Sequence, residues 1–121
     1  MFRRTQLQQT ETIDMLRAEN LKKYTEIYTK DGERIGVALR FVHRPIEDVN
    51  EALRLYRTYL VLQSIVLGGP AYIPTVYIGN YDSIGNRLNL SADLDTLEDE
   101  TWNREPNFVA RGLGVYEELP E

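Results

Sequence analysis

Alternating apolar and polar side chains in the first third of the chain predict a pair of strands. Residues 24–29 are rich in β-branched and aromatic side chains, which favour strands. Residues 34–42 continue the alternation, and one face of this second strand is expected to carry Val37, Leu39 and Phe41. Asp31-Gly32 stands between the two segments. This pair accommodates the backbone angles of a tight turn, so a hairpin is predicted here.

The alternation returns in the second half of the chain and predicts three further strands, over residues 59–67, 71–78 and 87–90. Gly68-Gly69-Pro70 separates the first two, and residues 79–85 are interpreted as a turn. Short strands joined by tight turns are typical of small β domains. We therefore expect a mainly β fold, a small partly closed antiparallel β-barrel, because closure hides most strand edges.

Helical spacing replaces alternation near the start of the chain. Residues 3–23 place Ile13, Leu16 and Leu21 near one face of a predicted N-terminal helix. This apolar stripe is thin, so the helix needs a second surface for stability. Two surfaces fit, the sheet of the same chain or a second copy in a homodimer. Residues 46–58 are ambiguous, since their pattern fits either a helix or an acidic loop.

A short helix is predicted after the last main strand, capped by Ser91 and with Leu94 and Leu97 facing inward. Trp102 is expected to pack against these two leucines. The chain then divides into an N-terminal helix or tail (1–21), a β domain (22–106) and an acidic flexible tail (107–121). Phe108 and Val109 are the candidate anchors of that tail.

Composition limits the classes of partner and chemistry. The 121 residues carry a net charge of −5, and nine of the 19 acidic side chains lie after residue 90 with only two basic ones. Clustered positive charge, which DNA binding needs, is missing from the sequence pattern, so DNA is disfavoured. There are no cysteines, which removes disulfides and thiolate metal sites. No apolar run reaches the length of a membrane span and no secretory signal begins the sequence, so a cytoplasmic protein without membrane insertion is expected.

Four motifs in a fixed order resemble the PRC-barrel superfamily. They are Asp31-Gly32-Glu33-Arg34-Ile35-Gly36, Tyr72-Ile73-Pro74, Gly85-Asn86-Arg87-Leu88-Asn89-Leu90-Ser91, and Trp102 with Pro106. This family includes the cytoplasmic domain of the photosynthetic reaction centre H subunit and the C-terminal domain of a ribosome maturation factor. The resemblance implies a β-barrel that docks to other proteins, sometimes on RNA-containing assemblies, and implies no shared catalytic residue. The long charged connection at 44–58 departs from the family pattern.

Candidate chemical groups do not form a recognisable catalytic or metal-binding pattern. His43 is the only histidine, and no nucleophile or ligand spacing accompanies it. The carboxylates of Asp93, Asp95 and Glu98 lack the spacing of a calcium loop. The glycine pairs lack the context of a phosphate-binding loop. We therefore expect a protein that is not an enzyme, with no catalytic residue, no cofactor and no metal.

Aromatic and basic residues suggest the surface that a partner would contact. The candidate interaction surface comprises Arg54, Tyr56, Arg57 and Tyr59, residue types enriched at protein interfaces. Packing in the core or at the barrel rim is the competing interpretation of these tyrosines. The resulting hypothesis is a non-enzymatic interaction or scaffold module with an unidentified protein partner. Two alternatives stay open, a small-molecule-binding or enzymatic barrel, and an RNA-assembly factor that uses Arg40, Arg44, Arg54 and Arg57.

Overall fold

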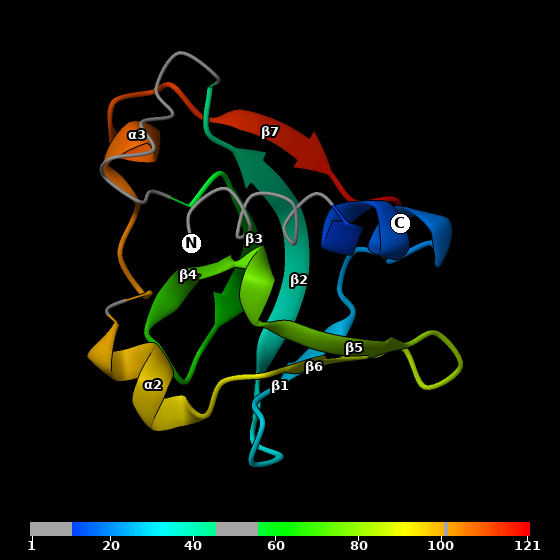
Figure 1. Ribbon diagram of the computed structural model, residues 1–121. Helices are drawn as coiled ribbons and strands as arrows, with labels where there is room; N and C mark the ends of the chain where they lie inside the picture. The colour runs from blue at the N-terminus through cyan, green and yellow to red at the C-terminus, as the bar shows by residue number, and fades with distance from the viewer. Residues whose placement is uncertain (1–10, 46–55, 101) are drawn as a thin grey trace.

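A single mixed β-sheet organises the chain in the computed structural model, which describes residues 11–45, 56–100 and 102–121 (Figure 1). The strands of the described residues are β1 (Glu26–Tyr28), β2 (Arg34–His43), β3 (Thr58–Ser64), β4 (Gly69–Pro74), β5 (Ile78–Asp82), β6 (Arg87–Leu90) and β7 (Val115–Glu118). The helical elements are residues 11–18, the 3₁₀ turn η3 (Thr75–Tyr77), α2 (Leu94–Asp99) and α3 (Asn107–Ala110). The prediction of a mainly β fold is confirmed.

The sheet runs in the order β4-β3-β2-β1-β6-β5, and β7 pairs with β2 outside this path. Most neighbours are antiparallel, but β1 and β6 are parallel, so the sheet is mixed and the predicted antiparallel β-barrel is not confirmed. Parallel pairing sets Ile27 beside Leu88, and both side chains are fully buried. The sheet is not closed, because β4 and β5 at its two ends do not pair with each other.

A bulge in β2 changes which of its side chains face the core. The pairing with β3 shifts register between Ala38 and Arg40, and such a shift inserts one extra residue and reverses the alternation beyond it. Ala38 and Phe41 consequently share the main core, whereas Val42 belongs to a second apolar cluster on the other face. The predicted face of Val37, Leu39 and Phe41 is therefore wrong, since uniform alternation cannot pass a bulge.

The predicted hairpin at Asp31-Gly32 is confirmed by the antiparallel pairing of β1 with β2. Gly32 has a φ of +87°, a left-handed conformation that glycine adopts without steric cost. Gly36 serves a different need, because a Cβ there would lie 2.0 Å from the Gln63 carbonyl oxygen. The close approach of β2 to β3 at this point therefore requires a residue without a side chain.

Two local expectations are corrected by hydrogen bonds from aspartate side chains. Residues 79–82 belong to β5 rather than to a turn, and the Asp82 carboxylate starts the turn by accepting bonds from the Ile84 and Gly85 amides at 3.1 Å. Asp93, rather than Ser91, caps α2, and it accepts a bond from the Thr96 amide at 2.9 Å. A carboxylate competes well for these backbone donors, which explains both departures.

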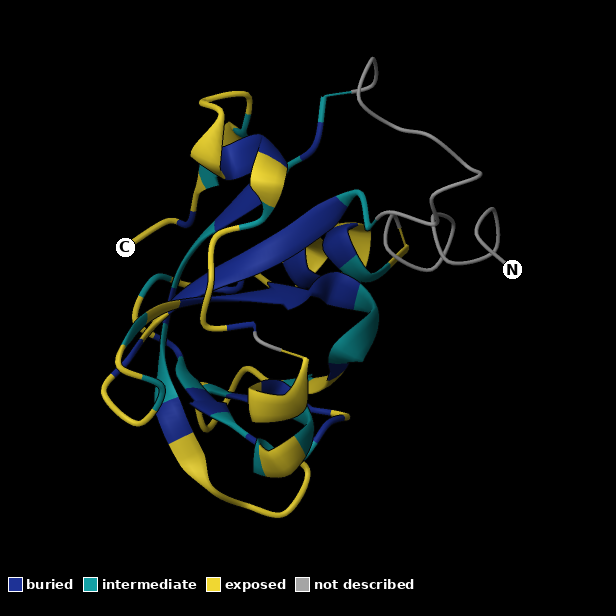
Figure 2. Ribbon diagram, turned by 90° about the vertical axis from the view of Figure 1, so that its left-hand side faces the viewer, coloured by how far each residue is buried: buried dark blue, intermediate teal, exposed yellow. Residues whose placement is uncertain are grey.

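Both ends of the described chain pack on the sheet. Residues 11–18 are helical, and Ile13 and Leu16 join the main core, which matches the expectation of a helix docked on its own domain. The segment 107–121 forms α3 and β7 instead of the flexible tail that was predicted. Its buried residues, including Phe108 and Leu119, supply the apolar contacts that order it. Figure 2 shows how buried and exposed positions are distributed along the chain up to its C-terminus.

Residues 46–55 lie outside the described residues, and with them most of the 46–58 segment whose helix-or-loop character the sequence leaves open. Among the described helices, none has the length and apolar character required to cross a membrane.

Trp102→Ala is expected to lower the free energy of unfolding by about 3–5 kcal/mol, the usual cost of emptying a large aromatic site. Trp102 is 7% exposed and belongs to the main core together with Leu97. Its ring centroid lies 4.6 Å from that of Tyr77. Urea unfolding measures the change, with Ile65→Ala as control because Ile65 is 94% exposed. Equal stability of the two variants would contradict the burial of Trp102.

Candidate interaction surface

The face of the sheet opposite the main core carries a second apolar cluster, which we call the outer cluster. Its buried members come from β2, β3, β4 and α3, and they are Val42, Tyr59, Val61, Tyr72, Phe108 and Val109. α3 covers one half of this face, since the Phe108 ring lies 5.9 Å from the Tyr59 ring. The other half, towards β7, is where the exposed Tyr116 lies next to Val61 and Tyr72.

A buried arginine holds the covered half together. Arg44 is 7% exposed, and its guanidinium carbon lies 4.3 Å from the centre of the Phe108 ring. Its Nε donates to the Tyr56 carbonyl oxygen at 2.8 Å. Cation–π contact and a charge-assisted hydrogen bond together stabilise the charged side chain in this position. Arg44 therefore acts in packing, which weakens the predicted RNA-binding set of arginines.

The four residues predicted from the sequence to form an interaction surface differ in their exposure. Arg54 lies outside the described residues, and Arg57 is partly exposed. Tyr59 is buried, and burial raises the pKa of its phenol above the ordinary value. Tyr56 is half-buried, with its hydroxyl 3.3 Å from that of Tyr77. Burial, followed by that hydrogen bond, raises the pKa of Tyr56. The two tyrosines therefore pack within the domain at this end of the outer cluster.

The uncovered half of the same face contains a hollow of about 360 Å³, which we call the β7 groove. It is lined by Arg40, Val61, Tyr72, Tyr116 and Glu118. Val61 and Tyr72 are buried members of the outer cluster, whereas Tyr116 is 54% exposed at the rim. The groove thus combines an apolar floor with an aromatic side chain that is open to solvent.

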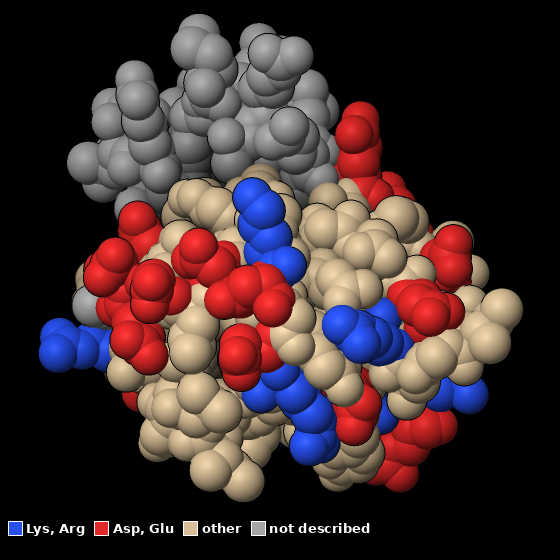
Figure 3. All heavy atoms as spheres, turned by 90° about the horizontal axis from the view of Figure 1, so that it is seen from below, with Lys and Arg blue, Asp and Glu red and all other residues tan. Residues whose placement is uncertain are grey.

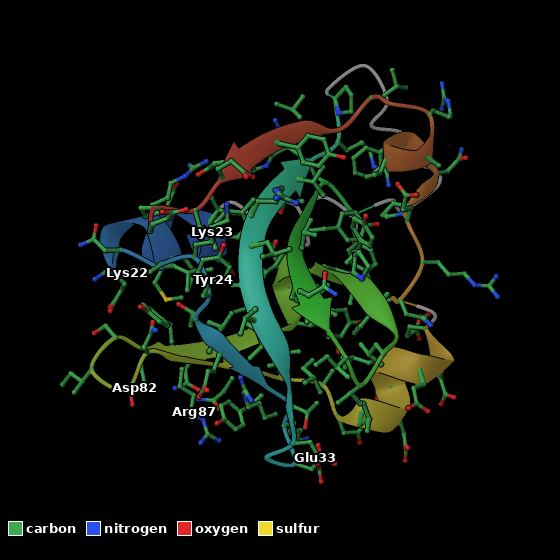
Figure 4. All side chains as sticks on the ribbon, turned by 180° about the vertical axis from the view of Figure 1, so that it is seen from behind. Lys22, Lys23, Tyr24, Glu33, Asp82 and Arg87 are labelled. Atoms are coloured by element: carbon green, nitrogen blue, oxygen red, sulfur yellow. The ribbon has the colours of Figure 1, made fainter. Side chains whose placement is uncertain are left out.

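Two cations hold Glu118 at one end of the groove. Arg40 forms an ion pair with Glu118, and Lys23 Nζ lies 3.3 Å from the same carboxylate. Figure 4 shows Lys23 just before β1, near the end of β7. The hydrogen bond from Arg40, ahead of that from Lys23, lowers the pKa of Glu118. These contacts connect β7 to β2 and to the segment that leads into β1.

Glu117 fastens the other face of β7 to the N-terminal helix. Its carboxylate accepts hydrogen bonds from Arg17 at 2.5 and 2.9 Å. Nε2 of His43 lies 2.9 Å from the same carboxylate, so the only histidine has a structural contact. The hydrogen bond from Arg17 is the main cause of a lowered Glu117 pKa, and His43 adds to it.

The sequence interpretation missed the β7 groove because its residues lie far apart in the chain. Tyr116 falls in the segment predicted to be a flexible tail, and it pairs with Val42 across the sheet. One local signal was present, the β-branched and aromatic pair Val115-Tyr116 after Gly114, which is typical of a short strand after a turn.

Carboxylates gather elsewhere, over α2, as Figure 3 shows for the face seen from below. Among them, Asp93 has a structural role as the N-cap of α2. The hydrogen bond that its carboxylate accepts from the Thr96 backbone amide lowers the pKa of Asp93. Within residues 11–45, 56–100 and 102–121, no three histidine or carboxylate side chains are placed to share a metal ion.

Comparisons with protein-family models, with curated proteins and with solved structures find no match to this chain.

Glu117→Gln is expected to destabilise the fold by about 1 kcal/mol near pH 6, the upper part of the range for exposed ion pairs. The lowered pKa of Glu117 means that its contribution is complete above the ordinary glutamate value of about 4.3 and is lost as the pH falls through the folded-state pKa. The difference between wild type and variant should therefore shrink as the pH falls below the ordinary glutamate value, and disappear once Glu117 is protonated in the folded state.

Urea unfolding at a series of pH values checks this expectation. Glu98→Gln is the control, because Glu98 is exposed on α2. A Glu117→Gln effect that persists unchanged in acid would show that the glutamine disturbs packing rather than charge.

Proposed function

We propose that this chain is a non-enzymatic protein-interaction module of the PRC-barrel type, and that it docks a partner protein in the β7 groove. The order of its sequence motifs and the mainly β sheet support this proposal. The partly closed barrel is part of the same proposal. Its support is that β4 and β5, the two ends of the sheet, are joined directly through η3. A cytoplasmic location also belongs to the proposal.

The observation that carries the proposal is the β7 groove, where the exposed Tyr116 lies beside Val61 and Tyr72 of the outer cluster. Phe108 of α3 packs against Tyr59, and both side chains are buried. Val61 and Tyr72 of the same apolar cluster line the β7 groove, next to Tyr116. Large aromatic side chains that are exposed next to apolar surface are characteristic of binding sites. A partner that inserts an apolar side chain would bury Tyr116 and complete the cover that α3 begins.

The polar groups of the groove suit binding better than proton transfer. Arg40 and Glu118 are engaged with each other. Burial raises the pKa of Tyr72, and the charge of Glu105 and the nearby Tyr116 add to this effect. A phenol with a raised pKa stays protonated near neutral pH and acts as a hydrogen-bond donor.

A small molecule is the second candidate occupant, because a volume of about 360 Å³ falls within the range of known ligand sites. Such a ligand would contact Tyr72 and Tyr116 through its apolar surface. A thermal-shift screen of small aromatic compounds against wild type and Tyr116→Ala tests this candidate. Stabilisation that depends on Tyr116 would favour it over a protein partner.

Tyr116→Ala is expected to weaken partner binding about 30-fold or more, the effect of removing an aromatic hot spot worth about 2 kcal/mol. The measurement is affinity capture of the tagged protein from its source lysate, with and without nuclease treatment, quantified by mass spectrometry. Ile84→Ala is the matched control, since Ile84 is 98% exposed in the turn between β5 and β6.

Proteins that are retained by wild type and by Ile84→Ala, but lost from Tyr116→Ala, would support docking in the β7 groove. Equal retention by all three forms would contradict it. Partners that vanish on nuclease treatment would instead favour the RNA-assembly alternative.

A further inference from the structure

Residues 115–121, which we call the β7 strap, are attached to the rest of the domain by few apolar contacts. No residue of β7 itself is buried, and Leu119 is the one buried side chain of the strap. α3, which precedes the strap, is anchored differently, because Phe108 and Val109 are both buried. Figure 1 shows β7 running from the side of α3 to the N-terminal helix. The strap therefore depends mainly on polar contacts.

The site that receives Leu119 is incompletely filled. A hollow of about 200 Å³ lies between the strap and the N-terminal helix, and its lining includes Leu16, Phe41 and Leu119. A buried side chain beside a hollow forgoes part of the dispersion energy that close packing supplies. The apolar anchor of the strap is therefore weaker than a leucine in a well-filled core.

Backbone hydrogen bonds attach the strap to two neighbouring segments. β7 forms an antiparallel ladder with β2, and the Leu119 amide donates to the Leu39 carbonyl oxygen. The Lys23 amide donates to the Pro120 carbonyl oxygen at 2.7 Å. Because water can replace these bonds when the strap opens, each of them adds only a modest net stability.

Ion pairs supply the other polar attachment, and both carboxylates of the strap take part in them. Glu117 contacts the N-terminal helix and β2, whereas Glu118 contacts β2 and the segment before β1. The basic side chains that surround the two carboxylates are Arg17, Lys23, Arg40 and His43. The strap thus fastens three parts of the chain to one another through its two negative charges.

Loss of these two charges would reverse the electrostatic balance beneath the strap. The remaining titratable neighbours are Asp14, at 3.4 Å from Arg17, and the phenols of Tyr72 and Tyr116 beside Arg40. One carboxylate would then face the whole group of basic side chains, and close like charges repel each other.

The pH at which this reversal occurs follows from the pKa of each glutamate. Hydrogen bonds from Arg17 to Glu117 and from Arg40 to Glu118 are the main causes of a lowered pKa. A lowered folded-state pKa gives stability that is complete above the ordinary glutamate value of about 4.3 and is lost as the pH falls through the folded-state pKa. Acid therefore weakens the strap, and neutral pH keeps it attached.

We propose that the β7 strap releases from β2 as one unit when Glu117 and Glu118 lose their charge, while α3 and the other strands stay folded. Release takes Tyr116 and Glu118 out of the β7 groove and unpairs the edge of β2 from Arg40 to His43. The release itself is independent of the proposed function, but its effect on partner binding rests on that function. The strap is then a wall of the groove that is controlled by charge.

Amide hydrogen exchange measured by NMR on the full chain, without any partner, tests the release. The reporters are the Lys23 amide, which donates to the strap, and the Leu119 amide, which the strap donates to β2. The reference amides are those of Ala38 and Tyr72, whose hydrogen bonds lie outside the strap. Exchange by local opening is faster than exchange by global unfolding, so the two sets of amides distinguish these events.

The test variant combines Glu117→Gln with Glu118→Gln and is measured near neutral pH. Exchange at the two reporters should become about tenfold faster, the combined effect of several weak surface ion pairs. The reference amides should keep their wild-type rates. The matched control combines Glu98→Gln with Asp99→Asn, which removes the same charge from exposed positions of α2 and should change neither set.

Wild type gives the same comparison without a substitution. Its reporter amides, corrected for the intrinsic exchange rate at each pH, should lose protection as the pH falls below the ordinary glutamate value. The difference between wild type and the Glu117→Gln/Glu118→Gln variant should shrink over the same range.

Equal acceleration of reporters and references would overturn release as a unit, because the strap would then open only with the whole fold. Unchanged reporters, or the same acceleration in the α2 control, would overturn the role of the two charges. A strap that stays closed while lysate proteins still depend on Tyr116 would overturn this inference and leave the proposed function intact. A strap that opens as expected, with no Tyr116-dependent partner, would support the inference and contradict the proposed function.

Discussion

β2 forms hydrogen-bonded ladders along both of its edges, with β3 on one side and with β1 and then β7 on the other. A buried strand cannot leave its backbone groups unpaired without a large cost. The ten residues of β2 therefore need more than one partner on the second side, because β1 covers only the part from Arg34 to Val37. β7 completes that side, and the ordered C-terminal segment follows from this need.

The bulge in β2 lets the same strand serve two cores. Ala38 and Phe41 face the main core, and Val42 faces the outer cluster. A sheet that is apolar on both faces must be covered on both. The N-terminal helix contributes Leu16 to the first core, while α3 covers only part of the second. The β7 groove is the remainder of the second face, so its position is a consequence of how far α3 reaches.

Local sequence signals predicted the elements that local interactions determine. The hairpin at Asp31-Gly32 and the strand at 87–90 were found in this way, and the burial of Trp102 was also expected. The parallel pairing of β1 with β6 and the role of β7 depend on residues more than 60 positions apart. Residue types and spacing carry little information on such pairings. Tyr56 and Tyr59 were predicted as part of an interaction surface, but Tyr59 is buried and Tyr56 packs against the same cluster. Tyr59 lies beside Phe108 of α3, a helix that the sequence analysis did not predict.

The late position of β7 in the chain has a consequence for synthesis. A growing polypeptide can form the hairpins β1–β2, β3–β4 and β5–β6 early, because their strands are close in sequence. The edge of β2 from Arg40 to His43 must wait for residues 115–118. During that interval the nascent chain exposes an unpaired edge beside Phe41 and Val42, which is a site for misassembly or chaperone binding. Ribosome-bound chains that end before residue 115 would then differ from longer ones in protease sensitivity at β2.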